Sequence, residues 1–274
     1  MHLKTLHNKI INDALEMHSA IKKVLPRNLP KRYTGNFLYF SSFIDRLNAV
    51  TVPLKVCNQI IKDEDGLLKP NELQMTAEWK PKSETTINRR SPDIYIQWHI
   101  NSSTRRFPIT KAGWKRRRFY FWAYLMHELA HRHQDTSRPV SIGSKQFAPI
   151  TDDKELWERQ MYLGDFDEIE AYAHDVALEM IIWFPKMTYR EAFKKMKMIN
   201  RGLVRSTYPI FADAFEETPT HPAMLVLRKK IRAWYRLMNE QRDAYRILDL
   251  EPLRSTLVRP VASSDKTSYR KETR

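Results

Sequence analysis

One segment of this chain combines apolar residues with two histidines and a glutamate: Phe119-Tyr-Phe-Trp-Ala-Tyr-Leu-Met-His-Glu-Leu-Ala-His131. His127, Glu128 and His131 lie at the border of its apolar face. Buried polar side chains cost free energy unless they have a partner, so these three are expected to share one. Intervals of three and four residues predict a helix with one face in the core, and the apolar residues at those intervals are Phe119, Trp122, Met126 and Leu129.

The spacing His127-Glu128-Leu-Ala-His131 suits a metal ion. Residues four apart on a helix lie one turn apart on the same face, so two imidazoles there can bind one tetrahedral Zn²⁺. Glu128 lies about 100° further round the helix. From there it can take a proton from a metal-bound water without being a ligand. We therefore predict zinc ligands at His127 and His131 and a catalytic base at Glu128; the alternative is a structural helix with coincidental histidines.

A catalytic zinc site needs a third protein ligand. The candidates are Glu168, Glu170 and His174, in a helix predicted over residues 166–183. Glu170 borders the apolar stripe of that helix and is the preferred ligand, whereas Glu168 points toward its polar side. His174 and Asp175 are predicted to hydrogen-bond a ligand and fix its orientation. Glu168, and to a smaller extent His174, stay open as alternative ligands.

The composition limits the classes of protein that fit. The chain has 274 residues, 42% of them hydrophobic, with a net charge of +15 and a single cysteine, Cys57. One cysteine excludes a disulfide framework and any multi-cysteine zinc site. The apolar run from Phe119 to Met126 is too short to span a bilayer, and the N-terminus lacks a secretion signal. We expect a globular protein that does not enter the membrane and works in the cytoplasm, or in a host's cytoplasm if a phage encodes it.

Positive charge is concentrated in residues 105–118 and 254–274. Such runs attract nucleic acid, but they also form ordinary solvated surfaces. The sequence contains no zinc finger, RNP-type motif or GxxG loop. Nucleic-acid binding through these two runs is therefore compatible with the sequence but is not predicted from it, and the sequence leaves the oligomeric state open.

The hydrophobic patterns predict an α+β fold. We expect one domain over residues 1–252, with an N-terminal helix and sheet (1–114), active-site helices (115–183) and a helical region (188–246), followed by a flexible basic tail (253–274). Strict alternation predicts a strand at 93–100. Further strands are predicted at 48–56 and 106–111, and helices at 5–25, 115–135, 153–163, 166–183, 188–200 and 220–246.

These motifs resemble those of the zincin metallopeptidases, specifically the glutamate-ligand (gluzincin) branch. In ImmA/IrrE-type peptidases the second helix reads E-x-x-A-N-x-x-A, and here Glu170-Ala-Tyr-Ala-His174-Asp-Val-Ala177 is similar, with histidine in place of asparagine. HtpX-like peptidases have E-x-x-A-D, and a later T-H-P segment that resembles Thr220-His221-Pro222. That last match is equally typical of a helix N-terminus, with Thr220 as cap and Pro222 in the first turn.

The resemblance implies a zincin-like fold, in which a small mixed β-sheet packs on the active-site helix and a helical C-terminal half follows. It implies hydrolysis of peptide bonds in a protein or peptide substrate, with Glu170 as third zinc ligand and His221 near the metal, where it helps to stabilise the transition state. Zincins align substrate on an edge strand, for which 93–100 is the candidate. Two alternatives stay open: a non-catalytic structural or assembly protein with a zincin fold, and a basic nucleic-acid-associated protein.

Overall fold

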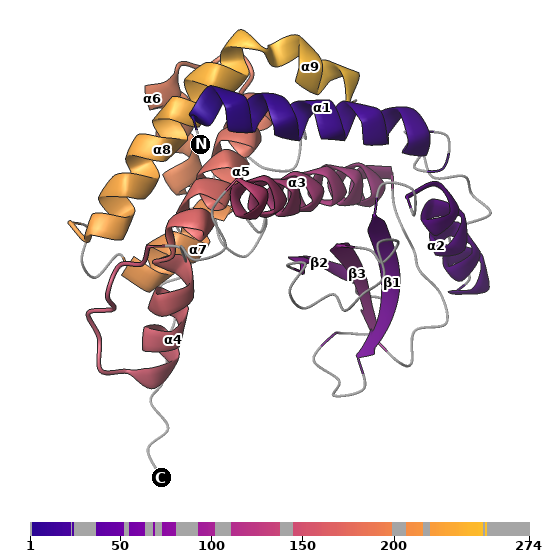
Figure 1. The fold of residues 1–274 in the computed structure, drawn as a ribbon, viewed down its shortest axis with the longest axis horizontal. Coiled ribbons are helices and arrows are strands. Elements are labelled where there is room, and N and C mark those ends of the chain that lie inside the picture. The colour runs from indigo at the N-terminus through magenta and orange to yellow at the C-terminus, as the bar shows by residue number, and fades with distance from the viewer. Residues whose placement is uncertain are drawn as a thin grey trace, which may run out of the picture.

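Helices make up most of the residues that the structure describes, and one small sheet lies between the second and third helices along the chain (Figure 1). The computed structural model describes residues 2–22, 24, 37–51, 55–63, 68, 73–80, 93–101, 111–137, 145–198, 207–215, 220–248 and 250. The predicted α+β class is confirmed. Within these residues no helix is both long enough and apolar enough to cross a membrane.

The sheet has three strands, β1 (Val56–Asp63), β2 (Leu73–Trp79) and β3 (Ile94–Asn101), in the order β1-β3-β2. β1 runs parallel to β3 and β2 runs antiparallel to it, so the sheet is mixed as predicted. β3 confirms the strand predicted at 93–100, and its buried face carries Ile94, Ile96, Trp98 and Ile100. However, β3 is the central strand and uses both of its edges, so the prediction that it is an edge strand is wrong.

Helix α3 (Lys111–Thr136) lies between the sheet and helix α1 (Leu3–Ile21), as Figure 1 shows. Because both of these faces are covered, the aromatic residues of α3 are buried: Trp98 of β3 stacks on Phe121, and His18 of α1 lies against Trp122. The predicted helix at 115–135 is confirmed. The core on either side of α3 fixes the position of the residues that follow Met126.

Helix α5 (Phe166–Trp183) contacts α3 on one side and α8 (Pro222–Glu240) on another. All of its residues from Ile169 to Trp183 are buried except the half-buried Tyr172. The remaining helices of this half are α4 (Lys154–Leu163), α6 (Tyr189–Met198), α7 (Thr207–Phe215) and α9 (Arg242–Ile247). The bounds predicted for the helix at 166–183 match α5, and α4 begins one residue after its predicted start.

Two predicted elements differ from the structure. The strand predicted at 48–56 is wrong, because helix α2 (Phe37–Thr51) continues to Thr51 and β1 starts at Val56. Asn48 ties these two elements together, since its Oδ1 accepts from the backbone N–H of Asn58 at 2.6 Å and its Nδ2 donates to the Asn58 carbonyl. The helix predicted at 220–246 is two helices that meet at Gln241.

Two further predictions fall on residues that the structure does not describe. The tail at 253–274 lies outside the described residues. So does the strand predicted at 106–111, apart from Lys111, which begins α3.

Candidate metal centre

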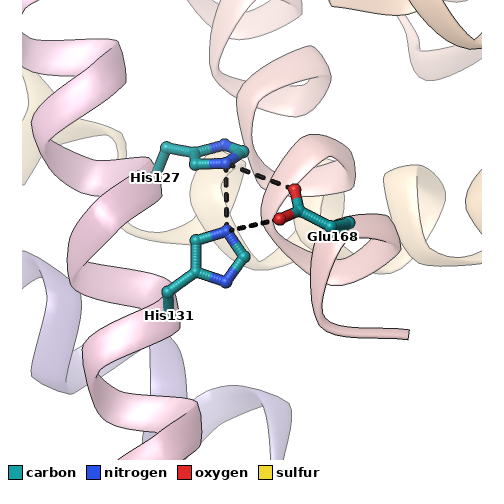
Figure 2. Close-up of side chains that lie close together, drawn as sticks. All are labelled: His127, His131 and Glu168. Carbon is teal, nitrogen blue, oxygen red and sulfur yellow. Dashed lines mark hydrogen bonds and ion pairs between the residues drawn. The ribbon is translucent and has the colours of Figure 1, made fainter. Parts of the chain in front are cut away.

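Three side chains from α3 and the first turn of α5 point toward one another (Figure 2). The Nε2 atoms of His127 and His131 are 3.1 Å apart. Glu168 Oε2 lies 3.7 Å from His127 Nε2, and Glu168 Oε1 lies 3.5 Å from His131 Nε2. This is the group of potential metal ligands found within the described part of the chain.

The geometry of the group fits a small metal ion. With bonds of about 2.0–2.2 Å, adjacent ligand atoms of a tetrahedral zinc lie roughly 3.3–3.5 Å apart, close to the separations found here. Glu168 Oε2 is buried and has no hydrogen-bond partner among the described residues. Such an atom is costly unless something else binds it. Two imidazoles and a carboxylate are also a ligand set that zinc commonly uses.

The electrostatics keep Glu168 ionised. Burial alone would raise the pKa of its carboxyl, but the interactions with the nearby His127 and His131 outweigh burial and lower this pKa to about 2. The carboxylate is therefore charged at neutral pH, which is the form that binds a cation.

Glu170, the predicted third ligand, does not join this group. Its Oε1 accepts from Trp234 Nε1 at 2.6 Å, and its Oε2 pairs with Lys230 Nζ, both on α8. Two residues correspond to about 200° around a helix, so Glu168 and Glu170 face opposite neighbours. The preference for Glu170 is therefore corrected: it was based on a single apolar stripe, whereas α5 is buried on several sides and has no such single face.

Asp175 and His174 form a chain of hydrogen bonds behind the histidines. Asp175 Oδ2 accepts from His127 Nδ1 at 2.8 Å, which leaves His127 Nε2 directed at the site. This is the contact predicted for Asp175. His174 Nδ1 lies 3.3 Å from Asp175 Oδ1, so His174 contacts Asp175 and not a metal-ligating side chain. Burial raises the pKa of Asp175, but His127 and the hydrogen bonds from both histidines outweigh this and hold it below its usual range.

Glu128 is close to the group but outside it. Burial raises the pKa of its carboxyl, and the nearby Glu168 acts in the same direction. His127, His131 and a hydrogen bond with the backbone of Trp79 oppose this rise without cancelling it. A carboxylate with a raised pKa beside two histidines is suited to accept a proton, which is the position expected for Glu128 from the sequence.

Two tyrosines adjoin the group, and the sequence analysis did not single them out. The ring of Tyr172 stands edge-on to His127, with their centroids 4.9 Å apart. Tyr162 is 52% exposed, and its hydroxyl is close to both Tyr172 and Glu168. The sequence does contain a pattern that points to Tyr172. This residue lies four positions after Glu168 and three before Asp175, so all three share one face of the helix.

His221 has a different environment. It is buried, its Nδ1 accepts from the backbone N–H of Ala223, and its ring stacks on Phe215 at 4.6 Å. It is the N-cap of α8, with Pro222 at the first helical position. The helix-start alternative for Thr220–Pro222 is therefore confirmed, although His221 and not Thr220 is the cap. His221 is not part of the metal-ligand group, and its expected role beside the metal stays a prediction.

Comparisons of the chain with protein-family models, with curated proteins and with solved structures find no match in any of the three.

Proposed function

We propose that this protein is a zinc-dependent metallopeptidase of zincin type, with His127, His131 and Glu168 as metal ligands. One observation carries the proposal: the potential ligand atoms of these residues converge within 4.8 Å, while the buried Glu128 adjoins them without belonging to the group. A purely structural metal site has no need of such a carboxylate. Two helices that pack through the core, α3 and α5, supply the whole arrangement.

A bound Zn²⁺ would lower the pKa of a coordinated water and polarise the scissile carbonyl. Glu128 accepts the proton of the attacking water and passes it to the leaving amine, as a general base and then a general acid. Asp175 holds His127 in the tautomer whose Nε2 is free to bind a metal. Tyr162, half exposed beside Glu168, replaces His221 as our candidate for stabilising negative charge on the carbonyl oxygen.

We propose β2 as the strand along which substrate lies, in place of β3. β2 forms one end of the sheet, and its last residue, Trp79, is hydrogen-bonded through its backbone to Glu128. An extended peptide that adds to a strand edge is held by main-chain hydrogen bonds. At β2 these bonds would position a peptide bond next to the proposed base.

The test is Glu128→Gln, which keeps the shape of the side chain but removes its basicity. Wild-type protein should bind about one zinc per chain and cleave peptides from a mixed-sequence library. General-base catalysis contributes about 10²- to 10⁴-fold, so the variant should lose at least about 100-fold in rate. Its zinc content, measured by elemental analysis, should be unchanged.

Glu16→Gln, an exposed change on α1, is the matched control and should behave as wild type. Equal cleavage by wild type and Glu128→Gln would refute the proposed mechanism. A zinc-loaded wild-type protein that cleaves no member of the library would favour the structural alternative instead.

A further inference from the structure

Helices α6 and α8 enclose a cleft of about 590 Å³ whose lining is strongly basic. Among the residues that the structure describes, no carboxylate lines it. The cations in its lining are exposed and come from both helices: Arg190, Lys194 and Lys197 from α6, and Arg232 and Arg236 from α8. None of them forms an ion pair with a carboxylate in the portions of the chain that the structure describes.

The cations form two rows. Arg190, Lys194 and Lys197 follow one another at four and three residues, so they lie on one face of α6 over about 10 Å. Arg232 and Arg236 repeat the pattern on α8, with one turn between them. Two facing rows of positive charge attract a ligand that carries negative charges in series, because a single small anion leaves most of the cations without a counter-charge.

An aromatic pair lies between the rows. The rings of Tyr189 and Phe193 stack at 5.6 Å with only 9° between their planes. Both line the cleft and are half-buried. Lys197 Nζ lies 5.2 Å from the centre of the Phe193 ring, and the Arg232 guanidinium lies 6.0 Å from that of Tyr189. Because both rings line the cleft and are only half-buried, part of each ring is exposed to groups that approach from the cleft.

The pair is held firmly from the protein side. Tyr208 packs edge-on against Phe193 with ring centres 5.1 Å apart, and Tyr235 packs edge-on against Tyr189 at 5.6 Å. The nearby acidic side chain of Glu191 is engaged at the start of α6, where it accepts hydrogen bonds from the backbone N–H and hydroxyl of Thr188. A rigid aromatic surface between rows of cations is thus fixed before any ligand arrives.

We propose that this cleft binds single-stranded nucleic acid, with backbone phosphates along the two rows of cations and a base against Tyr189 and Phe193. Rows of cations track a phosphate backbone, and aromatic rings give bases a surface for stacking that an acidic peptide cannot use. The site is separate from the proposed zinc site and does not depend on it. It is also distinct from the two basic runs at 105–118 and 254–274.

The experiment measures binding of a fluorescein-labelled 12-nucleotide oligothymidylate to the full-length chain by anisotropy over a range of salt concentrations. Arg232→Glu with Arg236→Glu should weaken binding about tenfold or more. A plot of the logarithm of the binding constant against the logarithm of the salt concentration becomes less steep by about 0.7 for each phosphate contact that is lost from a single strand. The slope for this double variant should therefore be smaller in magnitude by about 1.4.

Lys4→Glu with Lys9→Glu, on the exposed face of α1, is the matched control because it lowers the net charge of +15 by the same amount. It should weaken binding less than threefold. Lys194→Glu with Lys197→Glu tests the other row independently and should act like the α8 variant; circular dichroism checks that each variant is folded. Equal weakening by the control and the cleft variants would overturn the proposal, since binding would then reflect overall charge.

Two further ligands test the occupant. An abasic oligonucleotide of the same length should bind about fivefold or more weakly, because base–aromatic stacking is lost; equal binding would overturn the role of the aromatic pair. Polyglutamate, added at equal charge concentration, should compete poorly. If it displaces the oligonucleotide as well as unlabelled oligonucleotide does, the cleft is a site for an acidic protein segment and the proposal is wrong.

Discussion

Glu168 and Glu170 are separated by a single residue and have different electrostatic partners. Glu168 faces two histidines, whose proximity lowers its pKa to about 2 although burial acts in the opposite direction. Glu170 contacts Trp234 and Lys230 on α8. The first arrangement leaves a buried oxygen without a hydrogen-bond partner among the described residues, and the second satisfies both oxygens of the carboxylate. The two residues should therefore respond differently to the same substitution.

Glu168→Gln should lower zinc affinity by about 100-fold or more, because loss of a residue that merely supports a ligand already costs 10- to 100-fold. Glu170→Gln should change the affinity by less than about threefold. It should instead lower the free energy of unfolding by roughly 1–3 kcal/mol, since it weakens a charge-assisted pair with partly buried partners. Competition with a chromogenic chelator measures the first quantity and urea denaturation the second. The opposite ranking of zinc affinities would return Glu170 to the role of ligand.

His127, Glu128 and His131 could be identified from the sequence because all three belong to one helix, whose geometry fixes their relative positions. The third group could not, because it depends on which face of α5 meets α3. A useful signal did exist: Glu168, Tyr172 and Asp175 recur at four and three residues and form one polar face in a largely apolar helix. That face points at the histidines.

At the scale of elements, α1 packs against α3 and contacts α9, and the buried His7 of α1 lies at the contact with α9. His7 Nε2 lies 2.8 Å from the Tyr245 hydroxyl of α9, and the His7 ring packs edge-on against Trp234 of α8. Burial, and next the proximity of His174, lower the pKa of His7 to about 4. This histidine is therefore neutral in the folded protein at pH 7.

The lowered pKa makes stability depend on pH. The unfolded chain binds a proton at His7 near pH 6.5, whereas the folded protein does so only near pH 4. The stability that depends on neutral His7 is thus fully present above pH 6.5. As the pH falls from 6.5 to 4, the free energy of unfolding decreases by as much as about 3 kcal/mol. His7→Gln cannot ionise, so its free energy of unfolding should fall less between pH 7 and 4.5, as measured by urea denaturation at both values. Identical losses in both proteins would mean that His7 titrates normally.

Helices α3, α4 and α5 and strand β3 were predicted well, whereas α2, α7, β1 and β2 were not. α3 and α5 are 26 and 18 residues long, so local pattern was sufficient to place them. β2 alternates Leu73, Met75, Ala77 and Trp79 with polar residues, and this signal could have been found. β1 has two adjacent isoleucines, Ile60 and Ile61, which obscure its alternation. The order of the strands depends on pairing between distant segments, and no local pattern contains that information.

At the scale of the whole molecule, the proposed metal joins α3 to α5 and should stabilise the fold. A ligand that binds only the folded state stabilises it by about 2.7 kcal/mol at 100 times its Kd. For a chain of this size that corresponds to a rise in Tm of roughly 5 °C or more. Differential scanning fluorimetry of chelator-treated protein, with and without added zinc, measures the shift.

Glu168→Gln should reduce this shift, and Mg²⁺ should not reproduce it, because Mg²⁺ prefers oxygen ligands and an octahedral shell. The same rise in Tm with wild type and Glu168→Gln would show that zinc binds elsewhere on the chain.

The position of α5 between α3 and α8 has a consequence for how the sequence can change over time. Each added or deleted residue turns the remainder of a helix by about 100°. A single-codon insertion between Glu168 and Asp175 would move one of these groups away from His127 and, in the same step, displace His174 from Trp234. Point substitutions can be absorbed one neighbour at a time, but a shift in the phase of this helix is penalised on two sides at once, so length variation in descendants of this chain should be confined to its loops.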